Sequence, residues 1–291
     1  MTRSIVSGLT IASFGPLRSN GIASVRTPVA ALAIVLALTL AGSASAQEPV
    51  PDPGAKAPSA AEANNPLAKF QAFNVHNYYV PAISELDGQN SNAFWLRYAQ
   101  PFGKWLFRAS LPVARVPTAD SKTVSGLGDA NAFAAYLFNT GNPAVSAGVG
   151  PQITIPTGSE TETGTGRWLG GFAATFFDAR SKTVQWGGLV TWQKDFAGDD
   201  ARSPVNVFAV QPFYFFQLGG GLYVRGSAVA VFDIENDKYN VPVGLGIGKV
   251  VPTKKAVFNL FFEPQYTILS RGAGQPELQI FIGVNTQFVK K

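Results

Sequence analysis

The stretch LQIFIGVNTQF, residues 278–288, decides the fold because its side chains alternate between two faces. One face is apolar and ends in an aromatic ring: Leu278, Ile280, Ile282, Val284, Thr286 and Phe288. The other face is mostly polar or small: Gln279, Phe281, Gly283, Asn285 and Gln287. A tilted strand of about 9–11 residues is long enough to cross a bilayer. The stretch therefore predicts the closing strand of an outer-membrane β-barrel.

The same period-two alternation recurs upstream, which predicts further strands of the same kind. We expect strands at residues 68–79, 91–101, 104–114, 127–138, 144–156, 167–178, 184–195, 204–217, 221–233, 240–250, 256–267 and 277–288. The dipeptide Gln211-Pro212 predicts a bulge or an irregular edge within the eighth strand. The fold class is therefore all-β, a 12-stranded antiparallel transmembrane β-barrel of the outer membrane.

The connections between these strands differ in length. Those after even-numbered strands are short, as at Phe102-Gly103 and Leu218-Gly219-Gly220. Those after odd-numbered strands are mostly longer and more polar, as at residues 115–126 and 157–166. Short periplasmic turns that alternate with longer outer loops are typical of outer-membrane barrels. An even strand count then places both termini in the periplasm.

The composition favours a membrane barrel over a soluble one. Hydrophobic residues make up 46% of the 291 residues and charged residues 14%, against about 25% charged residues in soluble domains. A secreted β-sandwich or a lipocalin-like barrel would also alternate, but its solvent face would carry Lys, Glu and Asp. We expect aromatic girdles at the membrane interfaces from residues near strand ends: Trp95, Trp105, Trp168, Trp186, Trp192, Tyr136, Phe138, Tyr266 and Phe288.

The N-terminus predicts a secretory signal peptide at residues 1–46. A basic region without acids precedes an apolar run from Val29 to Ala41, and Ala44-Ser45-Ala46 matches a cleavage site. A membrane anchor is the alternative, although the run is shorter than the roughly 20 residues that a spanning helix needs. Residues 47–66, rich in Pro and Ala, predict a flexible periplasmic segment or one folded into the lumen. Residues 67–291 form the predicted barrel domain.

Charge and cysteine content exclude several classes of partner and cofactor. Removal of residues 1–46 takes away three arginines and no acid, so the net charge falls from +5 to +2. A nucleic-acid partner is therefore not expected. The chain has no cysteine, which excludes a disulfide framework, a thiolate metal site and lipoprotein acylation.

Several short motifs carry a family resemblance. They are Ser125-Gly126-Leu127-Gly128-Asp129, the run from Gly150 to Gly158, Gln211-Pro212, the run from Pro242 to Lys249, and Glu263-Pro264-Gln265-Tyr266. In their order and spacing, the chain resembles the bacterial outer-membrane family labelled "MetA-pathway of phenol degradation". The resemblance covers most of residues 68–288. It implies an outer-membrane barrel that takes up aromatic or other small hydrophobic compounds, and it supplies no site residues.

Charged residues on the polar phase are the candidate functional groups. They are Arg97, Arg108, Asp129, Arg167, Arg225, Asp233 and Glu263. An Arg or Lys that faced lipid at the midplane would cost about 2–4 kcal/mol, so these side chains should face the lumen. There they either brace the barrel as ion pairs or select solutes. Inward glycines either widen a path or let a small barrel close: Gly148, Gly150, Gly171, Gly187, Gly244, Gly246 and Gly248.

A lipid-acting enzyme is a second functional alternative, and it would have to use His76. A catalytic site needs a nucleophile, a base and an orienting group, and no serine of this chain lies in a nucleophile-elbow pattern. Loop acids at Glu160, Glu162 and Asp199-Asp200 lack His or Cys partners, so we expect neither a metal site nor a cofactor.

The sequence as a whole predicts passive passage of small hydrophobic or aromatic compounds. A structural or sensory barrel with a closed lumen is the other non-enzymatic alternative. The expected partners are outer-membrane lipids, the barrel-assembly machinery and the small solute itself. Phe288, the last outward aromatic residue, is the predicted assembly signal for that machinery.

Overall fold

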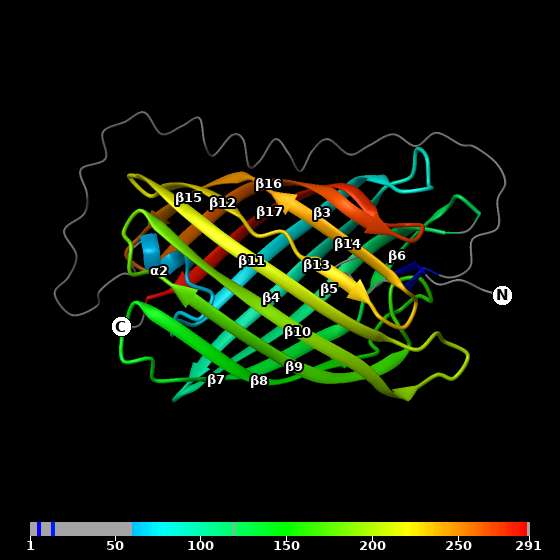
Figure 1. The fold of residues 1–291 in the computed structure, drawn as a ribbon, viewed down its shortest axis with the longest axis horizontal. Coiled ribbons are helices and arrows are strands. Elements are labelled where there is room, and N and C mark those ends of the chain that lie inside the picture. Colours follow the sequence, from blue (N-terminus) through cyan, green and yellow to red (C-terminus); the bar gives the residue numbers. More distant parts are fainter. Residues whose placement is uncertain (1–4, 7–12, 15–59, 119, 290–291) are drawn as a thin grey trace.

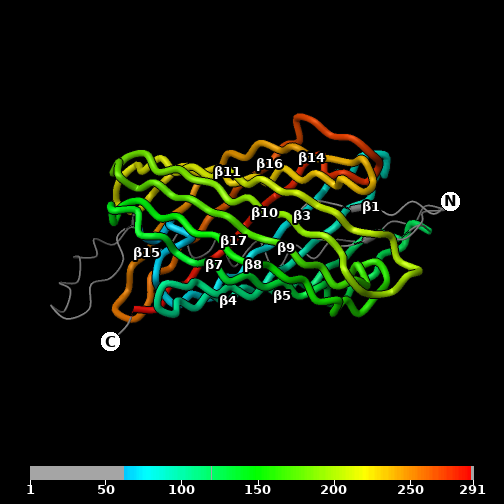
Figure 2. Tube along the Cα trace, turned by 60° about the horizontal axis from the view of Figure 1, so that its bottom comes forward, coloured from blue at the N-terminus to red at the C-terminus, as the bar shows by residue number. Residues whose placement is uncertain are grey.

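The computed structural model describes residues 5–6, 13–14, 60–118 and 120–289. Residues 72–288 form a closed antiparallel β-barrel whose strands run obliquely around its long axis (Figures 1 and 2). The predicted signal peptide lies outside the described residues apart from two short paired strands, β1 (Ile5–Val6) and β2 (Ser13–Phe14). In the part of the chain that the structure describes, no helix is long and apolar enough to span a membrane.

Fifteen strand segments build the barrel wall. Their bounds are β3 (Ala72–Ile83), β4 (Ser91–Phe102), β5 (Trp105–Pro117), β6 (Thr123–Leu127), β7 (Ala130–Leu137), β8 (Val145–Ile155), β9 (Arg167–Asp178), β10 (Val184–Gly198), β11 (Asn206–Gly219), β12 (Leu222–Gly226), β13 (Ala230–Asp233), β14 (Lys238–Gly244), β15 (Gly246–Pro252), β16 (Ala256–Arg271) and β17 (Pro276–Phe288). Three pairs of segments, β6–β7, β12–β13 and β14–β15, each make one interrupted strand. The wall therefore has the predicted 12 strands.

The last strand closes onto the first, as predicted. The stretch 278–288 forms most of β17, which pairs with β16 on one side and with β3 on the other. Its polar phase faces inward, so Phe281 is 3% exposed whereas Phe288 is 40% exposed. Closure gives every wall strand two neighbours and leaves no open sheet edge toward lipid.

Strand β16 shows how the alternation divides the side chains between lumen and lipid. Asn259, Glu263 and Gln265 are buried, whereas Phe262 and Tyr266 are 43% and 64% exposed. From Asn259 to Gln265 the inward phase of β16 is therefore polar apart from Phe261, and the outward phase is apolar, opposite to a soluble barrel. In a membrane barrel this arrangement hides charge from hydrocarbon.

The predicted strands agree with the observed ones except at their ends. The first strand begins at Ala72 rather than at residue 68 and extends to Ile83. Residues 115–126, predicted as a loop, mostly continue the wall, because the end of β5 pairs with β6 as a hairpin. Strand β16 likewise continues to Arg271. Polar composition hid these extensions, since strands that project beyond the bilayer need no apolar outer face.

The wall is interrupted at residues 227–229, between β12 and β13. Pairing with β11 stops at Tyr214↔Gly226 and resumes at Val210↔Ala230 in the same register. Pairing with the next strand stops at Arg225↔Gly246 and resumes at Val231↔Asn240, again in the same register. The predicted irregularity at Gln211-Pro212 lies in β11 opposite this interruption. It is therefore a gap in the ladder on both sides rather than a bulge in β11.

Candidate functional site

Four of the seven predicted charged residues come together in the barrel interior. Arg97, Arg225 and Glu263 are 8%, 6% and 0% exposed. Arg108 is half-buried on β5, the neighbour of β4. Arg97 and Arg108 project from the neighbouring strands β4 and β5, whereas Arg225 reaches in from β12, on the opposite side of the ring. The inward phase of β3, β4, β16 and β17 carries rings and amides between them.

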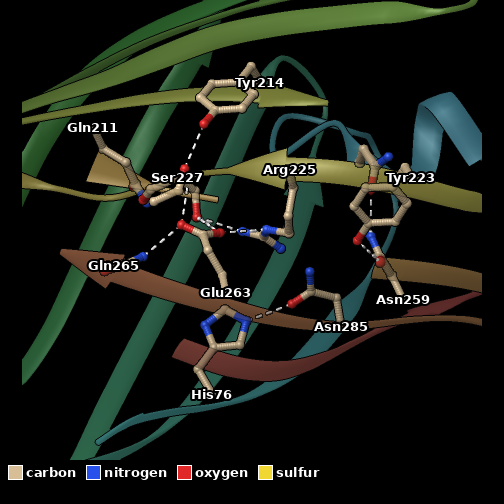
Figure 3. A network of polar contacts seen from close by, with 12 residues as sticks. His76, Gln211, Tyr214, Tyr223, Arg225, Ser227, Asn259, Glu263, Gln265 and Asn285 are labelled. Atoms are coloured by element: carbon tan, nitrogen blue, oxygen red, sulfur yellow. Dashed lines mark hydrogen bonds and ion pairs between the residues drawn. The ribbon is translucent and has the colours of Figure 1, made fainter. Parts of the chain in front are cut away.

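The Glu263 carboxylate accepts hydrogen bonds through both of its oxygens (Figure 3). Arg225 Nε donates to Oε2 over 2.7 Å, and the Ser227 hydroxyl donates to the same oxygen over 2.9 Å. Oε1 accepts from the Ser227 backbone N–H and from Gln265 Nε2. A carboxylate that is 0% exposed is tolerated only with this degree of compensation.

Side chains of the same network hydrogen-bond backbone groups that lack a ladder partner at the interruption in the wall. Residues 227–229 have no ladder partner, and unpaired backbone groups are costly in a membrane. Glu263 takes the Ser227 N–H, and Gln211 Nε2 donates to the Ser227 carbonyl over 2.8 Å. On the neighbouring strand, the Tyr214 hydroxyl donates to the Gly244 carbonyl over 2.6 Å. Glu263, paired with Arg225, therefore supplies one of the missing backbone partners at the interruption.

His76 links Arg97 to the last strand. Its Nδ1 lies 2.8 Å from Nη1 of Arg97, and its Nε2 lies 2.7 Å from Oδ1 of Asn285. Both ring nitrogens therefore have partners, and neither partner is a nucleophile. The geometry gives His76 a positioning role for Arg97, which weakens the enzymatic alternative.

Arg97 and Arg108 form a pair of cations without a carboxylate. Arg97 lies opposite Ser110, and Arg108 is two residues from Ser110 on the same strand. Such diagonal neighbours are about 7–8 Å apart along the backbone. No acid among the described residues forms an ion pair with either arginine. Each Nε is buried without a hydrogen-bond partner.

Aromatic rings surround these charges. Tyr78 stacks on Phe281 with ring centroids 4.2 Å apart, and Phe261 meets Phe281 edge-on at 4.7 Å. The Arg225 guanidinium lies 3.7 Å from the Phe261 ring centroid. Trp95, predicted as an interface residue, belongs to this inner cluster and is 6% exposed. The prediction was wrong because period-two alternation from Leu96 puts Trp95 on the inward phase of β4.

The other three charged candidates hold loops at the barrel rim. Asp129 accepts from the N–H groups of Gly158 and Thr165, which ties the loop 156–166 to the gap between β6 and β7. Arg167 forms an ion pair of 2.9 Å with Asp195. Asp233 accepts from Asn236 in the β13–β14 turn. These residues therefore do not join the central group.

A short segment before the barrel crosses the lumen at the end opposite to these loops (Figure 1). It contains helix α2 (Ala60–Asn64). Asn65 Nδ2 donates to Ser146 Oγ on β8 over 3.1 Å, and Asn259 Nδ2 on β16 donates to Asn64 Oδ1 over 2.7 Å. Strands β8 and β16 lie on opposite sides of the ring.

Apolar contacts hold the same segment in place. Leu67 is 3% exposed and packs with Leu106 and Leu137. Ala63 packs in a cluster of lumen side chains that includes Phe177 and Tyr223. Ala63, Asn64, Asn65 and Leu67 therefore contact side chains of the lumen. Residues 47–59 lie outside the described part.

The inward glycines mainly let neighbouring backbones approach. A Cβ at Gly150 would overlap the carbonyl of Ala134, and one at Gly171 would overlap the carbonyl of Trp192. At Gly248 it would meet the Tyr223 ring. These contacts support the role in barrel closure over the widening of a path. Among the described residues, no group of His, Asp and Glu has the arrangement of a metal site.

Several lumen residues were not anticipated as functional. Tyr78 and Trp95 lie beside Arg97, and Asn285 contacts His76. On β10 and β8, Gln193 Nε2 donates to Thr154 Oγ1. All lie on inward phases of the predicted strands. Sequence alternation does not give the register between strands. Without that register, the sequence could not show which of these residues lie close together.

Comparisons with known proteins support the fold. No protein-family model and no curated protein match the chain. An outer membrane channel from Pseudomonas putida F1 is 14% identical, with 83% of this chain and 100% of that chain covered and a TM-score of 0.55. The NanC porin is 10% identical, with 74% and 98% covered and a TM-score of 0.49. The toluene transporter TbuX of Ralstonia pickettii is 11% identical, with 79% and 93% covered and a TM-score of 0.32.

The fold is therefore that of an outer-membrane, porin-like β-barrel, as the Pseudomonas putida channel shows. At such low identities the likeness extends to the fold alone.

Proposed function

We propose that the chain is an outer-membrane channel for passive diffusion of small hydrophobic or aromatic compounds, with both termini in the periplasm. The observation that carries this proposal is the ring cluster Tyr78, Trp95, Phe261 and Phe281 in the lumen, on the phase that is otherwise polar. These rings lie next to the unpaired arginines rather than in the packed half of the barrel that holds Phe177 and Tyr223. Rings stack on and partly desolvate an aromatic solute at low cost in ordering.

The segment 60–67 gives this channel a closed state. It bridges opposite walls at the end where the chain enters and leaves the barrel. Its displacement would clear that end while the wall strands keep their pairing. Passage then follows the solute gradient, and no nucleotide or ion coupling is required.

A closed structural barrel is the second candidate, and a specific observation favours it. Tyr223, Phe177 and Glu263 are each 0% exposed inside the lumen, so side chains fill much of that half of the barrel. In this alternative the segment 60–67 is a permanent part of the interior. The two candidates differ in whether solute crosses the reconstituted protein.

Proteoliposome swelling distinguishes these functions. Phenylalanine and its ring-saturated analogue cyclohexylalanine are matched zwitterionic solutes that cross lipid slowly. We expect faster swelling in phenylalanine, and loss of that preference in Phe281→Leu. Phe107→Leu, on the lipid face, is the matched control and should keep it. Swelling no faster than in protein-free liposomes would favour the closed barrel, and swelling without preference would favour an unselective porin.

A further inference from the structure

Among the described residues, three of the five buried side-chain donors that have no acceptor lie close together in the lumen. They are Nε1 of Trp95, Nε of Arg97 and Nε of Arg108. All three lie on adjacent strands, because Trp95 and Arg97 are on β4 and Arg108 is on β5. A buried donor without a partner loses its bond to water and gains nothing in return. Asn74 Oδ1, opposite Arg97, is likewise buried without a partner, so this patch offers a ligand three donors and one acceptor.

The charge around these donors has the sign that attracts an anion. Arg225 is compensated by Glu263, whereas Arg97 and Arg108 are not paired with any described acid. His76 adds no compensation, since it accepts a hydrogen bond from Arg97 as a neutral ring. Two guanidinium groups on diagonal positions can present parallel donors to one carboxylate. The Asn74 amide lies opposite Arg97 and completes this polar patch.

The groups beside the arginines are flat and apolar. The Arg97 guanidinium carbon lies 4.9 Å from the Trp95 ring centroid, and the Arg108 guanidinium carbon lies 4.5 Å from that of Phe133. The Tyr78 ring centroid lies 5.9 Å from the Arg97 guanidinium carbon. A simple inorganic anion would contact the charges but not these rings. A ligand with both a ring and a carboxylate would use both.

Apolar side chains close the lumen on one side of the arginines. Leu106 is the next inward residue after Arg108 toward the periplasmic turn, and it packs with Leu67 and Leu137. The segment 60–67 therefore closes the lumen next to the arginines. A solute that enters from the loop end would reach the arginines before it meets the segment.

We propose that Arg97 and Arg108 form a binding site for a small aromatic carboxylate, with the carboxylate between the two guanidinium groups and the ring among Tyr78, Trp95 and Phe133. This proposal deepens the proposed function, because it names the solute class that the lumen retains. The site is distinct in role from Arg225–Glu263, which repairs the wall. His76 and Asn285 position Arg97 for it.

Calorimetric titration of the purified barrel in detergent tests the site without requiring flux. The probe is sodium benzoate, with benzamide as the same ring without charge and acetate as the same charge without the ring. We expect benzoate to bind at least about tenfold more tightly than either, as expected for hydrogen bonds to charged groups of about 1.5–3 kcal/mol. Equal affinity for benzamide would overturn the proposal, and so would the absence of benzoate binding.

Charge-removing variants locate the binding. Arg97→Gln and Arg108→Gln should each weaken benzoate binding about tenfold or more, whereas Arg271→Gln at the exposed rim should leave it unchanged. Heat-modifiable migration checks that each barrel is folded, and Arg108→Lys is the milder substitution if Arg108→Gln fails to fold. Unchanged binding in folded Arg97 and Arg108 variants would overturn the site.

The binding of benzoate and the passage of phenylalanine can fail independently of each other. A barrel that passes phenylalanine but does not bind benzoate overturns this site alone. A barrel that binds benzoate but passes no solute overturns the channel alone.

Discussion

Nη1 of Arg97 lies 2.8 Å from Nδ1 of His76. Arginine can only donate, so Nδ1 must accept and the imidazole proton must sit on Nε2, where it is donated to Asn285 Oδ1 over 2.7 Å. The only histidine of the chain is thus fixed in one tautomer between two strands. The ring therefore links Arg97 to Asn285 across β3.

This relationship predicts a difference between two substitutions at His76. Glutamine can accept from Arg97 through its carbonyl and donate to Asn285 through its amide, whereas phenylalanine can do neither. We expect His76→Gln to keep most benzoate affinity and His76→Phe to weaken it by roughly tenfold. Calorimetry on the folded variants measures this. Equal loss in both variants would show that His76 does not act through Arg97. Any lipid-hydrolysis activity that depended on His76 would revive the enzymatic alternative.

The Arg225–Glu263 pair predicts a loss of stability rather than of selectivity. Removal of one partner of a buried pair costs about 3–5 kcal/mol, because the other charge is left uncompensated. Glu263→Leu should therefore lower the free energy of unfolding by that order, and Arg225→Met combined with Glu263→Leu should recover part of it. Urea unfolding in lipid vesicles gives these free energies. A stable Glu263→Leu barrel would contradict the bracing role.

The packing of the barrel wall predicts that alanine destabilises the barrel at Gly187 but not at the adjacent Gly188. A Cβ at Gly187 would overlap the Phe176 carbonyl and the Phe213 ring, whereas a Cβ at Gly188 would meet only the Gln211 carbonyl at 3.6 Å. Gly187→Ala should therefore destabilise the barrel by about 1–3 kcal/mol, the usual cost of overpacking. Gly188→Ala should be nearly neutral. The thermal midpoint of heat-modifiable migration compares them, and similar midpoints would argue against close approach of β9 and β10.

Phe288 predicts an effect on assembly. Its ring is exposed at the end of β17, and its backbone pairs with Ala256. As the proposed signal for the barrel-assembly machinery, Phe288→Ala should reduce the amount of folded barrel in the outer membrane without changing the unfolding of the barrel that does form. Phe73→Ala, another exposed ring at that end of the wall, is the control. Equal yields of both variants would count against the signal.

The sequence predicted the strands well because membrane alternation is a strong local pattern. β9, for example, was placed at residues 167–178, as observed. It could not predict the gap at residues 227–229, where side chains such as Glu263 replace ladder bonds. It also could not separate the braced Arg225 from the unpaired Arg97 and Arg108, since pairing depends on the register between strands.

The segment 60–67 was equally beyond the reach of sequence patterns. Its Ala and Pro content is that of a linker, and its hydrogen bonds go to Ser146 and Asn259, which are distant in sequence. Only the closed barrel creates the interior in which Leu67 is buried.

The most direct test of the channel is the swelling rate of proteoliposomes that contain Leu67→Asp. A charge at this buried position is costly and should expel the segment from the lumen, whereas Lys69→Asp, at an exposed position, should not. If the barrel is a channel closed by residues 60–67, Leu67→Asp will swell in phenylalanine several times faster than the unsubstituted protein and Lys69→Asp will match it. If folded Leu67→Asp barrels swell no faster than protein-free liposomes, the lumen is not a path for solutes and the account is wrong.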